Sequence, residues 1–143
     1  MQEKTALLSE TEALQMNPVV LAFLGDAVYS LWVRERLVVS SGGTSADYQR
    51  AASLVESARG QSLLIERVLP LLTERETEIF KRGRNAKKAT KSKHATVFEY
   101  NRSTGFEAVL GFLHLTGNEK RVDELLSVME ELKVVPAPVS YKP

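Results

Sequence analysis

The sequence predicts an all-α fold, and two observations support that prediction. Apolar residues recur at the three- and four-residue spacing of helices along most of the 143 residues, and no segment alternates as a strand does. Residues with helix-capping chemistry stand before several of these segments. With 43% hydrophobic residues, the chain is long enough for one globular core, so we expect a single domain.

The first predicted helix is long and largely buried. Asn17 is a suitable N-cap and Pro18 suits the first helical position, and the apolar pattern then continues to about residue 39. Residues 40–43 (SSGG) end this helix. Thr44 or Ser45 can cap a second helix, which we expect to break or bend at Gly60.

Further helices follow in the second half of the chain. Residues 63–72 form a helical stretch that Pro70 should end or kink. The Thr-x-x-Glu spacing of residues 73–76 predicts a capping box and a short helix to about Arg82, followed by a loop. Residues 96–115 are apolar nearly all round, which predicts a second buried helix.

Asn118 can cap a final helix that carries one apolar stripe to Leu132. Prolines at positions 136, 138 and 143 then indicate a tail. We therefore expect an N-terminal extension over residues 1–14, the helical domain over residues 15–133 and a C-terminal tail over residues 134–143.

Composition excludes several functional classes. The chain has no cysteine, which rules out disulfides, cysteine-type zinc sites, iron–sulfur clusters and a thiolate nucleophile. The net charge of +1 by itself indicates neither a nucleic-acid-binding nor an acidic protein. No apolar run reaches the roughly 18 residues that cross a bilayer, and the N-terminus is polar. We expect a soluble, cytoplasmic protein with no membrane association.

Two carboxylates stand alone in the two most apolar segments. Asp26 is the only acidic or basic residue within residues 19–33, and Glu107 is the only carboxylate within residues 105–116. Burying an unpaired charge is costly, so each needs a partner. If each carboxylate bonds to a hydroxyl, an arginine or a backbone amide, its role is structural. If the fold instead brings the two carboxylates together, they suit the binding of Mg²⁺. Gly25 indicates a close approach of a ligand or of another helix at this point.

Residues 81–94 form a basic segment. They contain seven Lys or Arg residues and no acid, so the segment carries +7 although the whole chain carries only +1. A segment with this much positive charge and few apolar residues to bury is suited to contacts with phosphates. A merely solvated loop is the alternative.

Three motifs resemble the ribonuclease III family. Residues 23–28 (FLGDAV) look like the centre of the family's first acidic motif, and residues 106–111 (FEAVLG) resemble its second. Residues 82–87 (RGRNAK) between them are similar to the subgroup called Mini-ribonuclease III. The motifs occur in the family's order, and the resemblance covers roughly residues 15–133.

The resemblance implies a homodimeric ribonuclease III-type helical endonuclease domain that hydrolyses double-stranded RNA. It implies Asp26 and Glu107 as the catalytic, metal-binding pair, with Mg²⁺ as the cofactor and Mn²⁺ able to substitute. For the Mini subgroup it implies maturation of 23S ribosomal RNA precursor, with a large-subunit ribosomal protein as a further partner. We expect no double-stranded-RNA-binding domain, so recognition falls to the dimer surface, the basic segment or that partner. The residues assigned to RNA contacts are Arg82, Arg84, Asn85, Lys87, Lys88, Lys91 and Lys93.

The match to the family is incomplete at two positions. Ribonuclease III usually carries a further glutamate where this chain has Ala22 and an aspartate where it has Thr104. Ala22 lies four residues before Asp26 and Thr104 lies three residues before Glu107, so each shares a helical face with one of the two acids. We therefore predict weaker metal affinity, or fewer tightly held ions, than four carboxylates would give.

Two rival functions remain open at this point. A catalytically weak ribonuclease III-like protein would serve as an RNA-binding or ribosome-assembly factor, and a helical protein-interaction adaptor would leave Asp26 difficult to explain. Among other residues, Tyr29, Trp32 and His114 are expected in the core or an interface, and His94 has no visible partner.

Overall fold

The computed structural model describes residues 5–40, 42–88 and 95–132, and all regular structure within these ranges is helical. The predicted all-α fold is therefore confirmed. The predicted tail and the residues Lys91, Lys93 and His94 lie outside the described residues. In chain order the elements are α1 (Glu10–Leu14), α2 (Pro18–Ser40), α3 (Ser45–Glu56), α4 (Ala58–Val68), the 3₁₀ turn η1 (Leu69–Leu71), α5 (Glu74–Asn85), α6 (Val97–Leu115), α7 (Glu119–Leu126) and α8 (Val128–Glu131).

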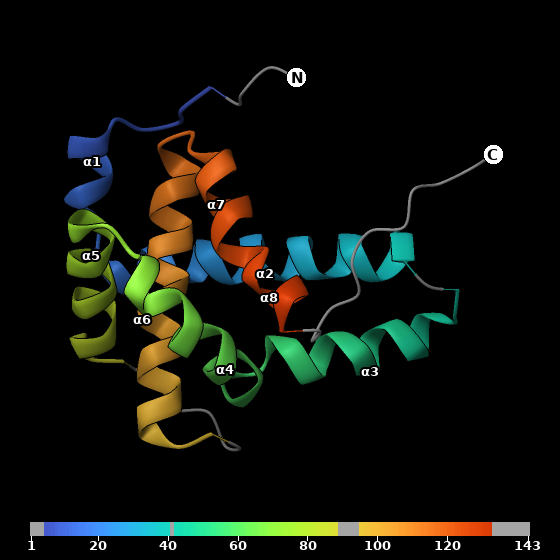
Figure 1. Ribbon diagram of the computed structural model, residues 1–143. Coiled ribbons are helices and arrows are strands. Elements are labelled where there is room, and N and C mark those ends of the chain that lie inside the picture. The colour runs from blue at the N-terminus through green and yellow to red at the C-terminus, as the bar shows by residue number, and fades with distance from the viewer. Residues whose placement is uncertain (1–4, 41, 89–94, 133–143) are drawn as a thin grey trace.

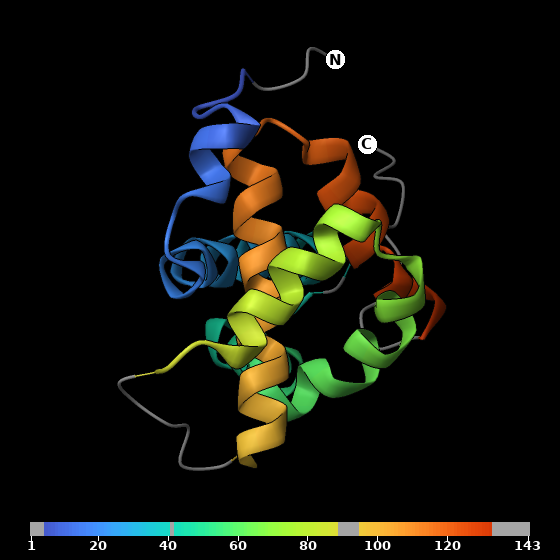
Figure 2. The same ribbon diagram turned by 90° about the vertical axis from the view of Figure 1, so that its left-hand side faces the viewer.

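Helix α6 is the central element of the fold, and α2 and α5 both cross it (Figures 1 and 2). From residue 102 to residue 113, every residue of α6 except Glu107 is buried. This confirms the predicted second buried helix. It also shows that Glu107 occupies the one place in that run where the covering of α6 is incomplete.

Helix α2 begins and ends where the sequence predicts, but the expectation that it is largely buried is wrong for one face. Asn17 caps it by accepting a hydrogen bond at 2.8 Å from the backbone N–H of Val19. Tyr29 and Val33 are fully buried, whereas Phe23 is 80% exposed and Leu31 is 61% exposed. Helix α2 is apolar on both sides and packs only one of them against the rest of the described chain.

Several helix boundaries differ from the sequence prediction. The N-terminal extension contains α1, whose Ser9-x-x-Glu12 capping box was overlooked, and it buries Ala13 completely. The break after α3 occurs at Ser57 rather than at Gly60, because Ser57 caps α4. Gly60 lies inside α4, where a Cβ atom would be 1.9 Å from the carbonyl oxygen of Leu54. Its role is therefore close packing of α4 against the end of α3.

The C-terminal helices also differ from expectation. The predicted final helix is divided at Ser127 into α7 and α8. The side chain of Asn118 does not cap α7; its amide donates to Thr116 instead. Capping boxes do form at Thr44, Thr73 and Thr96, the middle one as predicted.

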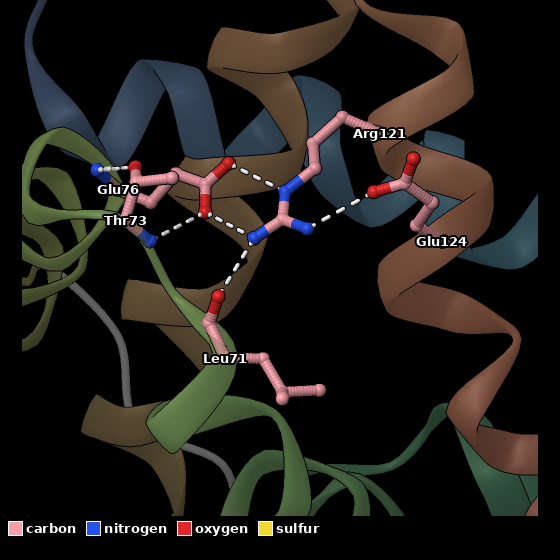
Figure 3. A network of polar contacts seen from close by, with 5 residues as sticks. All are labelled: Leu71, Thr73, Glu76, Arg121 and Glu124. Atoms are coloured by element: carbon pink, nitrogen blue, oxygen red, sulfur yellow. Dashed lines mark hydrogen bonds and ion pairs between the residues drawn. The ribbon is translucent and has the colours of Figure 1, made fainter.

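An ion pair between the half-buried Arg121 and the buried Glu76 joins α7 to the start of α5 (Figure 3). The guanidinium of Arg121 donates to both carboxylate oxygens of Glu76, at 2.9 and 2.8 Å, and to the carbonyl oxygen of Leu71. Burial alone would raise the pKa of Glu76, but hydrogen bonds from Arg121 and Thr73 hold it below its ordinary value. This pair fixes the position of α5, which packs beside the part of α6 that carries Glu107.

Among the described helices, none is long and apolar enough to cross a membrane.

Candidate active site

The crossing of α2 and α6 places Asp26 beside Glu107. At this crossing the helices touch through glycines: a Cβ atom on Gly25 would lie 1.7 Å from the carbonyl oxygen of Glu107. One on Gly111 would lie 2.0 Å from the carbonyl oxygen of Leu21. Only hydrogen atoms fit between the two backbones, so the close approach expected at Gly25 is one of helix to helix.

The two carboxylates interact directly. Burial raises the pKa of Glu107 to about 9, and a hydrogen bond with Asp26 and the negative charge of Asp26 act in the same direction. At neutral pH Glu107 therefore retains its proton when no cation is bound. Glu107 is the more buried member, since Asp26 lies on the exposed side of α2.

The sequence argument about Asp26 is thus corrected in one respect. Its position in an apolar segment indicated a buried charge that needs a partner. The structure places it at an exposed position on α2, on the same side as the exposed Phe23. Contact with Glu107, rather than deep burial, makes this position unusual.

A hollow of about 380 Å³ opens over the pair, and both Asp26 and Glu107 line it. Its floor comes from α2 and α6, and the end of α3 and the chain after α5 contribute Glu56 and Lys88. The remaining lining residues are Val19, Ala22, Phe23, Ala58, Tyr100, Ser103 and Thr104.

Ala22 and Thr104 line the hollow, and neither carries a carboxylate. The hydroxyl of Thr104 donates to the carbonyl oxygen of Tyr100 at 2.9 Å, within its own helix. A group of three or more His, Cys, Asp or Glu side chains placed to hold a metal ion is absent from the described residues. The donor set is therefore two carboxylates, and water and a substrate phosphate would have to complete the shell of a hard cation such as Mg²⁺. Two facing carboxylates that retain a proton fit such a cation, because it would take the place of that proton.

Sequence reasoning overlooked two residues at this site, Glu56 and Gln61. Glu56 ends α3 and lines the hollow, and its carboxylate lies 3.7 Å from Nε of Arg34. Gln61 is 1% exposed and points its amide at Glu107. The spacing of Gln61 with Leu64, Ile65 and Val68 puts a polar residue on the buried face of α4, and this signal is visible in the sequence. For Glu56 we find no local signal.

The basic segment divides into parts with different surroundings. Helix α5 continues to Asn85, beyond the predicted end near Arg82, so Arg82, Arg84 and Asn85 are helical rather than in a loop. Arg82 donates to the carbonyl oxygens of Leu14 and Met16, and it ties α5 to the chain before α2.

The basic residues that follow lie closer to the carboxylates. Lys88 donates to the carbonyl oxygens of Arg84 and Ala86 at the end of α5 and also lines the hollow. Its partial burial lowers the pKa of its ammonium group. Lys87 lies beside it, at the edge of a second hollow that Lys88 shares. Among the described basic residues, Lys88 is the one that the structure brings to the carboxylate pair.

The predictions for the other singled-out residues hold where they are described. Tyr29 is buried in the core, and its hydroxyl donates to the carbonyl oxygen of Val55 at 2.7 Å. Trp32 is 8% exposed and donates to Asp123. Nδ1 of His114 lies 2.7 Å from a carboxylate oxygen of Glu119, which gives it a structural partner.

Comparison with known proteins gives a consistent result. Residues 19–118 match the family described as Ribonuclease III domain. The chain is 45% identical over 114 residues to Mini-ribonuclease 3 from Streptococcus pneumoniae, covering 78% of this chain and 89% of the relative. It is 38% identical over 126 residues to Mini-ribonuclease 3 from a Thermoanaerobacter species, covering 88% and 89%. A crystal structure from Fusobacterium nucleatum superposes with a TM-score of 0.74 at 26% identity, covering 83% of this chain and 95% of that one.

Proposed function

Since the chain belongs to the ribonuclease III family, in its Mini-ribonuclease III subgroup, we propose that it is an endoribonuclease that hydrolyses phosphodiesters in double-stranded RNA. The observation that carries this proposal is the contact between Asp26 and Glu107 at the α2–α6 crossing, beneath an open hollow. Both residues come from the motifs that resemble the family's acidic motifs, and the fold brings them together.

Asp26 and Glu107 are the proposed metal ligands and catalytic residues, with Mg²⁺ as the ion and Mn²⁺ able to substitute. When bound, such an ion supplies a Lewis acid for the phosphate and lowers the pKa of a coordinated water. The protein's part is to present the two carboxylates side by side and to release the proton that Glu107 otherwise retains. Ala22 and Thr104 add no carboxylate, so RNA phosphate is expected to complete the site.

Lys88 is the proposed phosphate contact nearest the carboxylates, because it lines the same hollow. Its hydrogen bonds to the end of α5 hold it there, and its positive charge favours an approaching phosphate. Arg84, Asn85, Lys87, Lys91 and Lys93 are proposed to extend this contact along the RNA backbone. Arg82 is the exception, since its guanidinium already bonds to Leu14 and Met16.

The exposed face of α2 supports the proposed homodimer. Val20, Phe23, Leu31 and Val38 are between 47% and 80% exposed and follow one stripe along the helix. An apolar stripe of this length is typical of a protein interface. A second copy related by a two-fold axis would cover it with the same stripe and place one site against each strand of a duplex. Asp26 lies on the exposed side of the same helix, so the interface and the site adjoin.

We further propose that the substrate is 23S ribosomal RNA precursor, that a large-subunit ribosomal protein assists and that the protein acts in the cytoplasm. Family membership is the support for these three points.

The proposed activity is tested by incubating the purified protein with an RNA duplex and with a 23S precursor, in Mg²⁺ or in chelator. We expect cleavage in Mg²⁺ only, leaving 5′-phosphate and 3′-hydroxyl ends. Asp26→Asn should abolish cleavage and leave folding and RNA binding largely intact, whereas Glu35→Gln, an exposed carboxylate change on the same helix, should cleave normally. Retained cleavage by Asp26→Asn would refute the assignment of this residue.

One observation favours a second candidate function, a catalytically weak RNA-binding or ribosome-assembly factor. Among the described residues, no group of three or more His, Cys, Asp or Glu side chains is placed to hold a metal ion, and Ala22 and Thr104 stand where the family usually has two further acids. The same incubation separates the candidates, because this factor would bind the duplex or the precursor without cutting it in Mg²⁺.

A further inference from the structure

Gln61 is a buried polar residue that the proposed reaction leaves without a role. It lies on the face of α4 that also carries Leu64, Ile65 and Val68, and it is 1% exposed. A buried amide destabilises a fold unless its hydrogen bonds are made. The partners of this amide therefore indicate why it stands there.

The amide nitrogen of Gln61 faces two acceptors at the site. Nε2 donates to the backbone carbonyl oxygen of Glu56 at 3.2 Å and to Oε2 of Glu107 at 3.4 Å. Exchanging the amide's nitrogen and oxygen would turn an acceptor toward both of these oxygens, so the two acceptors determine the orientation of the amide. Gln61 thus connects the end of α3 to the carboxylate on α6.

The oxygen of the same amide is buried and accepts no hydrogen bond from the described residues. A methionine side chain has a similar length and would fill this space without burying an unpaired oxygen. For stability alone, an apolar residue would be the better choice here. What the amide offers that methionine lacks is the N–H directed at Glu107.

We infer that Gln61 is a positioning residue for the proposed nuclease reaction, an inference that rests on the proposed function. Its amide holds the Glu107 carboxylate against the corner of α3 and α4, with the other carboxylate oxygen left for the cation. Glu107 is the one incompletely buried residue between positions 102 and 113 of α6, and it lines the hollow. Without the amide, its side chain would be free to adopt rotamers that turn away from Asp26.

The test compares Gln61→Met with Ile65→Val, a change on the same buried face that removes a methylene group and touches no polar atom. Each variant is assayed for melting temperature, for Mn²⁺ affinity of the RNA-free protein, and for kcat and KM on an RNA duplex. For Gln61→Met we expect an unchanged or higher melting temperature, Mn²⁺ binding and kcat each reduced about 10- to 100-fold, and KM within about twofold of wild type. Ile65→Val should lower the melting temperature and leave kcat and Mn²⁺ affinity unchanged.

Wild-type kcat and wild-type Mn²⁺ affinity in Gln61→Met would overturn the inference. Equal losses of activity in both variants would overturn it as well, because they would trace to the fold. If Gln61→Met does not fold, Gln61→Leu replaces it under the same criteria. If the wild-type protein cuts no duplex, the proposed function fails, whereas the Mn²⁺ affinities still decide whether Gln61 positions Glu107.

Discussion

Gly25 packs directly against the backbone of Glu107, and this contact brings the two acidic motifs together. A Cβ atom on Gly25 would lie 1.7 Å from the carbonyl oxygen of Glu107, well inside any van der Waals contact. Asp26, the next residue, is therefore held beside the Glu107 side chain. Because Gly25 has no side chain, the two helices can pack closely enough to hold the two carboxylates together.

Gly25→Ala should destabilise the protein and reduce cleavage. Alanine favours a helix by up to about 1 kcal/mol over glycine, but separating two packed backbones should cost more, for a net loss of about 2 kcal/mol. Urea unfolding measures this loss. Gly42→Ala is the control, because a Cβ atom there has nothing within 4 Å, and its stability should change by less than about 0.5 kcal/mol. Equal stability of the two variants would contradict the packing described for the crossing.

Because the pKa of Glu107 is raised in the folded protein, the metal-free protein should become less stable as pH rises. Its folded pKa of about 9 exceeds the ordinary 4.5, so between these values the folded state keeps a proton that the unfolded chain has released. The stabilisation is complete below about pH 4.5 and is lost as pH approaches 9. Melting temperatures in chelator should therefore fall more steeply with pH for the wild type than for Glu107→Gln. Parallel curves would show that the carboxyl is not protonated at neutral pH.

Adding back a carboxylate should tighten metal binding. Ala22→Glu and Thr104→Asp each place an acid on the wall of the hollow, where another hard oxygen ligand is available to the cation. Mn²⁺ titration without RNA should show at most one tightly bound ion per site in the wild type and a higher affinity in either variant. Two tightly bound ions in the wild type would refute the reduced ligand set.

Charge removal after α5 should flatten the salt dependence of RNA binding. The triple change of Lys87, Lys91 and Lys93 to Ala removes up to three proposed phosphate contacts, and each contact adds about 0.7 to 0.9 to the slope of log affinity against log salt. Filter binding to a duplex across a salt series measures that slope. Lys120→Ala on α7 is the control and should leave it unchanged. An unchanged slope in the triple variant would make this segment a solvated loop.

A charge on the exposed stripe of α2 should separate the proposed dimer. Leu31→Glu puts a carboxylate at a position that a second copy would cover, where burying it unpaired is strongly unfavourable. We expect a folded monomer by analytical ultracentrifugation and circular dichroism. Leu54→Glu, at a 78% exposed position on α3, should remain dimeric. A wild-type protein that sediments as a monomer at all concentrations would contradict the dimer.

Local signals in the sequence were sufficient for most of the helices. Capping at Asn17 and Thr73 and the apolar periodicity of α2 and α6 act within one or two turns, so they are readable without the fold. Asp26 and Glu107 are also recognisable from the sequence as unusual, because each is a single acid within an apolar segment. Short helices are harder to predict, and α1 was overlooked because its five residues carry almost no periodic pattern.

Which residues meet was decided by the tertiary structure alone. The sequence marked Asp26 as a costly charge, yet the packing of α2 left it on an exposed face, and the glycine contact brought it to Glu107. In the same packing, the amide of Gln61 donates to Glu107, and the guanidinium of Arg82 donates to a backbone carbonyl before α2. The physical reason is range: capping and periodicity depend on neighbours along the chain, whereas a site depends on which faces of distant helices pack together.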